Sequence, residues 1–505
     1  MEYATGVTHS GSSSRPGPAR RPTAIDLFSG VGGLSLGFEM AGFDVLAALD
    51  HDPVHAAGHS RNFPLSEVLC ADAASVEPSA VMNAARRGFL AHFGHEAWDG
   101  EIDVVIGGTP CQGFSAGGKR AQDDPRNELS FQFRRLVLAL RPRYFVLENV
   151  PGLRSFRWQG APSERLLDRL IDGFEAGGYS VLPPQVLNAA DFGVPQQRRR
   201  LIVIGVRAGE ESVEFPHPTS HPANSSLAPS LPLGPTVWDA IGDLPDADVF
   251  DQLRSTSVVG LTGEVLAGME AKSSSYVRGL RYSDDDALNL AYRRAWDPAQ
   301  LTSSMRTLHG AVSVERFRAT PQGCREKTSR FLRLDPSGVA PTIRAGTGYD
   351  RGSFMAPRPL HPVHHRVITV REAARLHSFP DWFQFHVTKW HGFRQIGNSL
   401  PPVVGRAIGA QLIRAMKLKP PRPSRVLQAG SQTLLEMSTG QAAEWFDATG
   451  ESVPSHRLRT RRTGPSLSRV PHRAENSGGV AIPTGASGPR RPGGLDAKLA
   501  PALTG

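Results

Sequence analysis

A cysteine in a restricted loop is the first residue whose surroundings indicate chemistry. Residues 107–115 read GGTPCQGFS and place Cys111 directly after a proline. They follow the apolar run 102–106, so we expect Cys111 at the end of a strand, where open α/β sheets carry their reactive groups. The other cysteines, Cys70 and Cys324, do not indicate a disulfide framework. A cysteine alone is most often a small buried apolar residue, so the neighbouring motifs decide its role.

Charged side chains flank two further apolar stretches. Glu148 ends the run YFVL in YFVLENV, where a buried glutamate is costly unless it is paired or used. The run QQRRRL starts at Gln196 and leads into a predicted strand over residues 201–206. Arg198 and Arg200 point to one face of an extended chain, which favours a shared role. A run of three arginines is about as often a solvated surface, and the run alone leaves both interpretations open.

Residues 25–37 read IDLFSGVGGLSLG, which predicts a strand, a glycine turn and a helix. Glycines let the backbone approach a ligand, and a helix N-terminus offers free N–H groups. Ser35 stands where the dinucleotide pattern requires its third glycine. Asp50 ends the next apolar run and is placed to bind ribose hydroxyls, and Asp72 follows the third. These features fit S-adenosylmethionine better than NAD, because no pyrophosphate cradle is present.

The elements that must position these residues alternate between apolar strands and helices up to about residue 207. This order predicts an α/β fold with a mixed, mostly parallel sheet covered by helices on both faces. The segment QIGNSLPPV at residues 395–403 predicts a turn that leads into a last helix ending near Met416. Between residues 215 and 342 the alternation fades and prolines, glycines and polar runs increase, which predicts a second, smaller module. A loop-rich insertion is the alternative for this interval.

Six blocks, in this order, resemble the signature blocks of the DNA cytosine-5 methyltransferases. The resemblance covers residues 23–415, and an ordered set of blocks is far more specific than any one of them. The blocks are FSGVGG at 28–33, PCQ at 110–112, ENV at 148–150, QQRRR at 196–200, RVITVREAARLHSFP at 366–380 and GNS at 397–399.

The resemblance implies a Rossmann-like S-adenosylmethionine-dependent methyltransferase fold and a covalent mechanism. The Cys111 thiolate would add to carbon 6 of cytosine, so that carbon 5 becomes nucleophilic enough to attack the cofactor's methyl group. Glu148 would hold the N3/N4 edge of the base. Arg198 and Arg200 would orient the flipped base, the Cys111 loop and a nearby phosphate. The base that removes the carbon 5 proton is not identified.

The same resemblance assigns a cofactor site and no metal. Asp50 departs from the glutamate that is more frequent in the family, and its shorter side chain reaches less far toward the ribose. The residues expected to bind S-adenosylmethionine are Phe28 beside the adenine, Gly30, Gly32 and Gly33 at the methionine part, Asp50 at the ribose, Asp72 at the adenine amino group, and Pro110 and Asn398 closing the site.

Five segments are expected. Residues 1–22 form a disordered N-terminal segment, 23–214 the catalytic cofactor-binding domain, and 215–342 the target-recognition domain that reads DNA. Residues 343–416 complete the catalytic domain, and 417–505 form a disordered basic tail. The glycine-rich loop at residues 115–124 is expected to act as a lid.

Composition agrees with a nucleic-acid partner. The chain has 505 residues, a formal net charge of +9 and a pI near 9.8, as expected for a protein that binds a polyanion. It has no apolar run long enough to span a membrane, few cysteines and no export signal. We expect a monomer in the bacterial cytoplasm that acts on double-stranded DNA, with a cognate restriction endonuclease as functional partner.

Two other functions fit parts of the sequence. One is a tRNA cytosine-5 methyltransferase, because a branch of the same family acts on tRNA. The residues Gly113, Phe114 and Ser115 after the cysteine and the long recognition interval favour DNA. The other is a catalytically dead DNA-binding regulator, against which the intact Cys111 and Glu148 argue.

Overall fold

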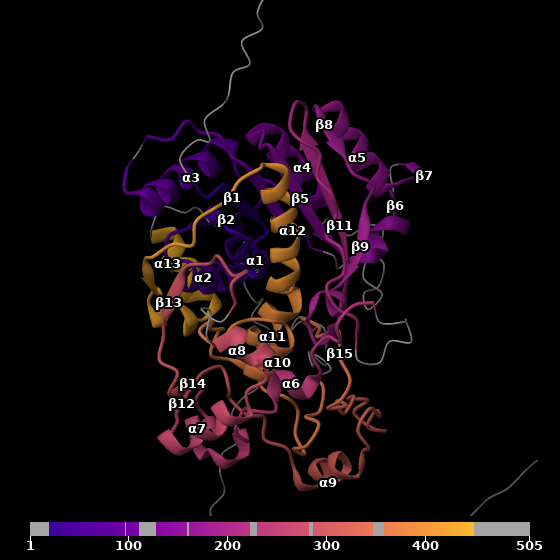
Figure 1. Cartoon of the computed structure of the whole chain (residues 1–505), viewed down its shortest axis with the longest axis vertical. Helices are drawn as coiled ribbons and strands as arrows, with labels where there is room; N and C mark the ends of the chain where they lie inside the picture. Colours follow the sequence, from indigo (N-terminus) through magenta and orange to yellow (C-terminus); the bar gives the residue numbers. More distant parts are fainter. Residues whose placement is uncertain are drawn as a thin grey trace, which may run out of the picture. The chain divides into compact units, whose positions relative to one another are not determined.

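The computed structural model describes seven segments of the chain: residues 20–95, 97–110, 128–158, 161–222, 230–281, 286–346 and 358–448. The chain divides into two compact units, Met1–Pro454 and Ser455–Gly505, and all described residues belong to the first (Figure 1).

The first unit is built around an eight-stranded sheet in the order β3-β2-β1-β4-β5-β11-β8, with β9 also paired to β11. The strands β3, β2, β1, β4 and β5 are parallel, and β11 runs antiparallel to β5, β8 and β9. The predicted mixed, mostly parallel α/β fold is therefore confirmed. The bounds are β1 (Thr23–Leu27), β2 (Asp44–Asp50), β3 (Glu67–Cys70), β4 (Val104–Gly108), β5 (Tyr144–Asn149), β8 (Tyr179–Val181), β9 (Gln185–Asn188) and β11 (Arg199–Arg207).

Helices cover both faces of this sheet, which explains why its central strands are near-continuous apolar runs. One face packs on α3 (Pro78–Phe93), α4 (Leu129–Leu140) and α5 (Leu166–Ala176). The other packs on α1 (Gly33–Ala41) and α12 (Pro402–Ala415), the helix predicted to end near Met416. The helices α1 and α12 lie side by side (Figure 1), and a Cβ on Gly37 would lie 2.6 Å from the Pro402 carbonyl oxygen.

The remaining elements are short. Around the large sheet lie α2 (Pro53–Asn62), η2 (Pro151–Ser155), β6 (Arg157–Trp158), β7 (Ala161–Arg165), η3 (Ala189–Phe192) and β10 (Gln196–Gln197). The smaller module contains α6 (Val237–Ile241), η4 (Ala247–Val249), η5 (Asp251–Arg254), β12 (Val259–Gly260), α7 (Gly263–Lys272), α8 (Ser275–Arg281), β14 (Gln300–Leu301) and α9 (Ala311–Ala319). Between the module and α12 lie β15 (Ala340–Pro341), α10 (Val370–Leu376) and α11 (Lys389–Asn398).

The smaller module does not coincide with the whole interval 215–342. Strand β13 (Arg293–Ala295) pairs with β16 (Val426–Gln428) from the far end of the chain. Tyr292 donates its hydroxyl to Asp44 of β2, 3.0 Å away. Part of the interval expected to read DNA is thus attached to the large domain.

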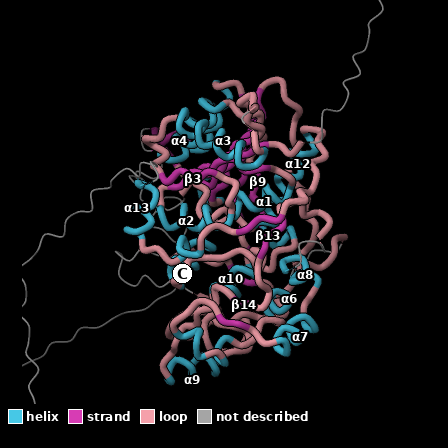
Figure 2. The backbone as a smooth tube through the Cα atoms, turned by 90° about the vertical axis from the view of Figure 1, so that its left-hand side faces the viewer, coloured by secondary structure: helices cyan, strands magenta, loops and turns pink. Residues whose placement is uncertain are grey.

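Of the residues expected to be disordered, 20–22 and 417–448 are described, and they are folded. Arg21 is buried and its Nε lies 2.7 Å from Asp44 Oδ1. The prediction of a disordered tail from residue 417 is wrong for residues 417–448, which contain β16, η7 (Gln432–Leu435) and α13 (Thr439–Ala448). Apolar side chains drive this packing, since Leu434, Met437, Ala442 and Phe446 share a core with residues of β2, α2 and β3. Both views show α13 beside α2 (Figures 1 and 2).

The helix α10 begins as predicted. Thr369 accepts from the Glu372 N–H while Glu372 accepts from the Thr369 N–H, which completes a capping box. The guanidinium of Arg375, on the same helix, is fully buried between Asp243 and Asp381, at 2.7 and 2.6 Å. No helix in the described part of the chain is both long and apolar enough to cross a membrane.

Candidate active site

The site is expected where the parallel strands β1, β4 and β5 end. In the sheet β1 lies between β2 and β4. From β1 the chain continues to β2 on one side, and from β4 it continues to β5 on the other. The gap between β1 and β4 is therefore a topological switch point, where open sheets bind ligands. Leu27 of β1 is in register with Gly107 of β4, and Gly108 with Glu148 of β5. The glycine loop after β1, the segment leading to Cys111 and the acid on β5 therefore start from one edge.

Cys111 itself, and the loop at residues 115–124 expected to be a lid, lie outside the described residues. The two residues before Cys111 are described: Thr109 is buried and Pro110 is half-buried. Asn149 donates from Nδ2 to the Thr109 carbonyl oxygen (3.3 Å) and to its Oγ1 (2.9 Å). Asn149 thus ties the end of β5 to the backbone that enters the cysteine loop, a positioning role that the sequence did not assign.

Glu148 and Arg200 form an ion pair. Arg200 Nε lies 2.6 Å from Glu148 Oε1, and the two side chains are 12% and 9% exposed. The other carboxylate oxygen lies against Gly108, because a Cβ there would be 2.7 Å from Glu148 Oε2. Such a charge-assisted bond, shielded from water, fixes the carboxylate beside the strand that leads to Cys111.

Arg198 does not lie with this pair in a position to contact a base, contrary to the shared role expected. It is 1% exposed, and its guanidinium donates to three backbone carbonyls. Nη1 bonds Ile343 (3.0 Å), and Nη2 bonds Gly397 and Ser399 (2.7 Å each). Arg198 is therefore a positioning residue that fastens the QQRRR segment to the turn around Asn398.

Two buried side chains from the quoted blocks, to which no individual role was assigned, support the same turn. His377 Nε2 lies 3.0 Å from the Ser399 carbonyl oxygen, and its Nδ1 lies 3.0 Å from Gln196 Nε2. Burial, with the charges of Arg198 and Arg200, holds the pKa of His377 well below its usual value. The neutral ring donates from Nε2 and accepts at Nδ1. Local sequence does not reveal these hydrogen bonds, because Gln196, His377 and Ser399 lie in separate segments of the sequence.

The glycine loop after β1 has the backbone expected of a ligand cradle. Phe28, Gly30 and Gly32 have φ of 60°, 56° and 99°. A phenylalanine in this left-handed region is strained, and such strain is concentrated at functional sites. A Cβ on Gly33 would lie 2.6 Å from the Leu400 carbonyl oxygen, so the loop packs directly on the turn that carries Asn398.

The two acids expected at the cofactor lie at neighbouring strand ends. Asp50 Oδ2 accepts from the Gly30 N–H and Oδ1 from the Asp52 N–H, both at 2.8 Å. Asp72 follows β3 and accepts from the Ala74 N–H. The backbone N–H of Ala71 donates to the Asp50 carbonyl, which keeps these ends together.

This arrangement fits S-adenosylmethionine. Each Asp50 oxygen accepts one backbone hydrogen bond and keeps a lone pair for a ribose hydroxyl. Phe28 is partly exposed at one end of the loop, and Asn398 is exposed on the turn packed against Gly33. His51, next to Asp50, is 59% exposed and its Nδ1 lies 3.7 Å from Asp50 Oδ1.

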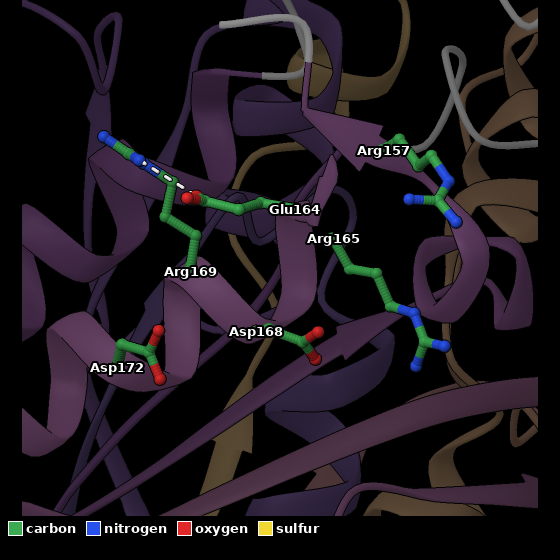
Figure 3. Close-up of a pocket in the computed structure, with 6 residues that line it drawn as sticks. All are labelled: Arg157, Glu164, Arg165, Asp168, Arg169 and Asp172. Atoms are coloured by element: carbon green, nitrogen blue, oxygen red, sulfur yellow. Dashed lines mark hydrogen bonds and ion pairs between the residues drawn. The ribbon is translucent and has the colours of Figure 1, made fainter. Parts of the chain in front are cut away.

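A surface pocket lies elsewhere, at the β6–β7 hairpin and α5 (Figure 3). The ion pair between Arg169 and Glu164 spans 3.3 Å with both side chains about half exposed, so it contributes little stability. The pocket contains none of the expected site residues; it is lined by Arg157, Glu164, Arg165, Asp168, Arg169 and Asp172.

Comparisons with known proteins agree with this geometry. The family model for C-5 cytosine-specific DNA methylase matches residues 23–414. The Type II methyltransferase M.XorII of Xanthomonas oryzae is 45% identical over 90% of this chain and 98% of its own length. M1.HphI of Haemophilus parahaemolyticus is 33% identical over 78% of this chain and 87% of its own.

One solved structure gives the same result in three dimensions. It is the crystal structure of an E. coli prophage protein described as a DNA modification methyltransferase. It is 33% identical, has a TM-score of 0.59, and covers 78% of this chain and 99% of that one. With the family model matching most of the chain and a close relative matching nearly its full length, the chain belongs to the C-5 cytosine-specific DNA methylases.

Proposed function

We propose that this protein transfers a methyl group from S-adenosylmethionine to carbon 5 of cytosine within a specific double-stranded DNA sequence. The observation that carries the proposal is the Glu148–Arg200 pair at the end of β5, next to the strand that leads into Cys111. In a member of this family, this edge of the sheet carries three things: a nucleophile, a cofactor loop, and an acid that can bind the N3/N4 side of a base.

Each residue has a distinct task in the proposed reaction. Cys111 adds to carbon 6 and breaks the aromaticity of the ring, which leaves electron density on carbon 5. Glu148 holds the N3/N4 edge of the base, and Arg200 keeps that carboxylate in place. Asn149 sets the approach of the cysteine loop through Thr109. S-adenosylmethionine, held by the glycine loop and Asp50, supplies the methyl group.

Carbon 6 is hidden in a duplex, so the target base must leave the stack. We assign the grip on duplex DNA to the smaller module. A hairpin there, residues 324–333, carries the exposed Lys327 and Arg330 at its tip. Glu326 braces the tip by accepting from the N–H groups of Thr328 and Ser329. A rigid tip with two cations is suited to phosphate contacts.

We also propose a role for this protein in the bacterial cell. The relatives named above are Type II methyltransferases, so we expect this protein to protect DNA from a cognate restriction endonuclease. We expect it to act as a monomer in the bacterial cytoplasm, where its DNA substrate lies. The tRNA alternative is not favoured, since these relatives and the family model refer to DNA modification.

Methyl transfer from labelled S-adenosylmethionine to unmethylated genomic DNA tests the proposal. Bisulfite sequencing should find methylated cytosines in one short recurring motif, and Cys111→Ala should abolish them. Label entering tRNA but not duplex DNA would contradict the proposed substrate. Absence of any transfer by the wild type would favour the catalytically dead regulator.

A further inference from the structure

Three buried polar side chains form a hydrogen-bond chain beneath the glycine loop, and none of them has a role in the proposed function. Asp26 lies on β1, Ser35 on α1 and His59 on α2, and they are 1%, 0% and 0% exposed. Ser35 Oγ lies 2.5 Å from Asp26 Oδ2 and 3.0 Å from His59 Nε2. Both outer atoms, Asp26 Oδ1 and His59 Nδ1, are buried without a hydrogen-bond partner.

This hydrogen-bond chain adjoins the cofactor loop on more than one side. Ser35 lies in the first turn of α1, two residues after Gly33. His59 lies under the loop, because a Cβ on Gly32 would be 3.0 Å from its Cδ2. On the other side Asp50, which holds the Gly30 N–H, is the charged group that acts on Asp26.

No cation compensates Asp26 among its described neighbours. Its partners in register on β2 and β4 are the apolar Ala48 and Ile106. His59 is neutral, because burial lowers its pKa to about 3. Burial, helped by the nearby charge of Asp50, raises the pKa of Asp26 to about 7 although the bond from Ser35 lowers it. A buried carboxylate without a counter-charge is costly, so a cation placed above the loop would change its state.

Two hydrogen-bond directions satisfy the same geometry. With Asp26 ionised, His59 Nε2–H donates to Ser35, and Ser35 donates to the carboxylate. With one proton more, Asp26 donates to Ser35, Ser35 donates to His59 Nε2, and the ring proton sits on Nδ1. The first state carries one negative charge and the second carries none, and His59 is neutral in both.

We propose that Asp26 is the residue by which this enzyme favours the sulfonium cofactor over its neutral thioether product, with Ser35 and His59 positioning its proton. This inference rests on the cofactor site proposed above. S-adenosylmethionine and S-adenosylhomocysteine differ by one methyl group and one positive charge. The positive charge of a sulfonium at the glycine loop favours the state in which Asp26 is ionised, whereas the uncharged thioether favours neither state. Binding of the methyl donor thus releases a proton, and the three residues take up a proton again once the thioether has replaced the sulfonium.

The test is the dissociation constant of each ligand for the full chain, measured by calorimetry between about pH 6 and about pH 8. The ratio of the product's constant to the donor's should rise about fivefold over this range, as expected for a shift of about one pKa unit on binding. Asp26→Asn keeps the shape of the carboxyl group and should make the ratio independent of pH. Ionisations of the ligands themselves affect wild type and variant alike and so cancel in the comparison.

Two further variants test the roles within the chain if Asp26→Asn folds poorly. Ser35→Ala removes the donor to the ionised carboxylate, so the midpoint of the pH dependence should rise. His59→Phe removes the last acceptor of the neutral chain, so the midpoint should fall. A folding defect alone would not move the midpoint in opposite directions.

The outcomes separate this inference from the proposed function. Binding of both ligands with a ratio that does not depend on pH, or with the same dependence in wild type and Asp26→Asn, would overturn the inference and leave the function intact. Binding of neither ligand by the wild type would overturn the cofactor site and the inference together.

Discussion

Arg200 Nε lies 2.6 Å from Glu148 Oε1, and this pair joins the first residues of β11 to the end of β5. The two strands are antiparallel, with Ile202 opposite Glu148, so Arg200 reaches back along its own face to the carboxylate. The pairing of β11 with β5 therefore positions the acid that we propose holds the target base.

We expect Arg200→Met to reduce the rate of methyl transfer about a hundredfold, because Glu148 loses the cation that orients it. Glu148→Gln should have a similar effect, and the double variant should be little worse than either, since coupled residues are not additive. Single-turnover rates on duplex DNA give the comparison. Additive losses would contradict the idea that the two residues act as one unit.

Arg198→Met should act on stability instead. The variant removes the guanidinium bonds to three buried carbonyls, of which Ser399 keeps only its bond from His377, and this should lower the free energy of unfolding by about 3 kcal/mol. The exposed neighbour Arg199 gives the matched control, and Arg199→Met should change stability by less than about 0.5 kcal/mol. Urea unfolding followed by fluorescence measures both. Equal stabilities of the two variants would contradict the positioning role of Arg198.

The hairpin tip should contribute to DNA binding through charge. Removing a phosphate contact lowers the slope of log affinity against log salt by about one. We expect Lys327→Ala and Arg330→Ala each to do this, whereas Lys272→Ala, an exposed lysine at the end of α7, should not. Fluorescence anisotropy over a series of salt concentrations measures the slope. An unchanged slope in both hairpin variants would place the DNA elsewhere.

Phe446→Ala should show that the C-terminal helix is part of the fold. Phe446 is 3% exposed in the core with α2 and β3, so its loss should cost about 3 kcal/mol of stability. Its neighbour Trp445 is 46% exposed, and Trp445→Ala should cost far less. Thermal unfolding distinguishes them, and similar melting temperatures for both variants would contradict the packing of α13.

The parts of the fold predicted from sequence are those with a local signal. The strand ends at Asp50 and Glu148 follow apolar runs, and the glycines after β1 identify a close backbone approach. The capping box at Thr369 is likewise contained within four residues. Each of these features depends on neighbours in the chain, so pattern alone finds it.

The parts missed depend on distant partners. The burial of Arg198 is set by carbonyls of Ile343, Gly397 and Ser399, and nothing in QQRRR distinguishes it from a surface arginine. Asp26 and His59 become notable only when β1 and α2 are packed. The segment 417–448 has only a short apolar pattern, and the stretch after it is rich in glycine, proline and arginine, a composition typical of disorder. Its packing depends on β2, α2 and β3, which lie far away in the sequence.

The central claim is a covalent bond between Cys111 and the target cytosine. Duplex DNA that contains 5-fluorocytosine in the methylated motif tests it most directly, because fluorine at carbon 5 blocks the elimination that frees the enzyme. With S-adenosylmethionine present, the wild type should form an adduct that survives denaturing electrophoresis, and Cys111→Ala should form none. An adduct that persists in Cys111→Ala, or methylation by the wild type with no adduct, would contradict the account.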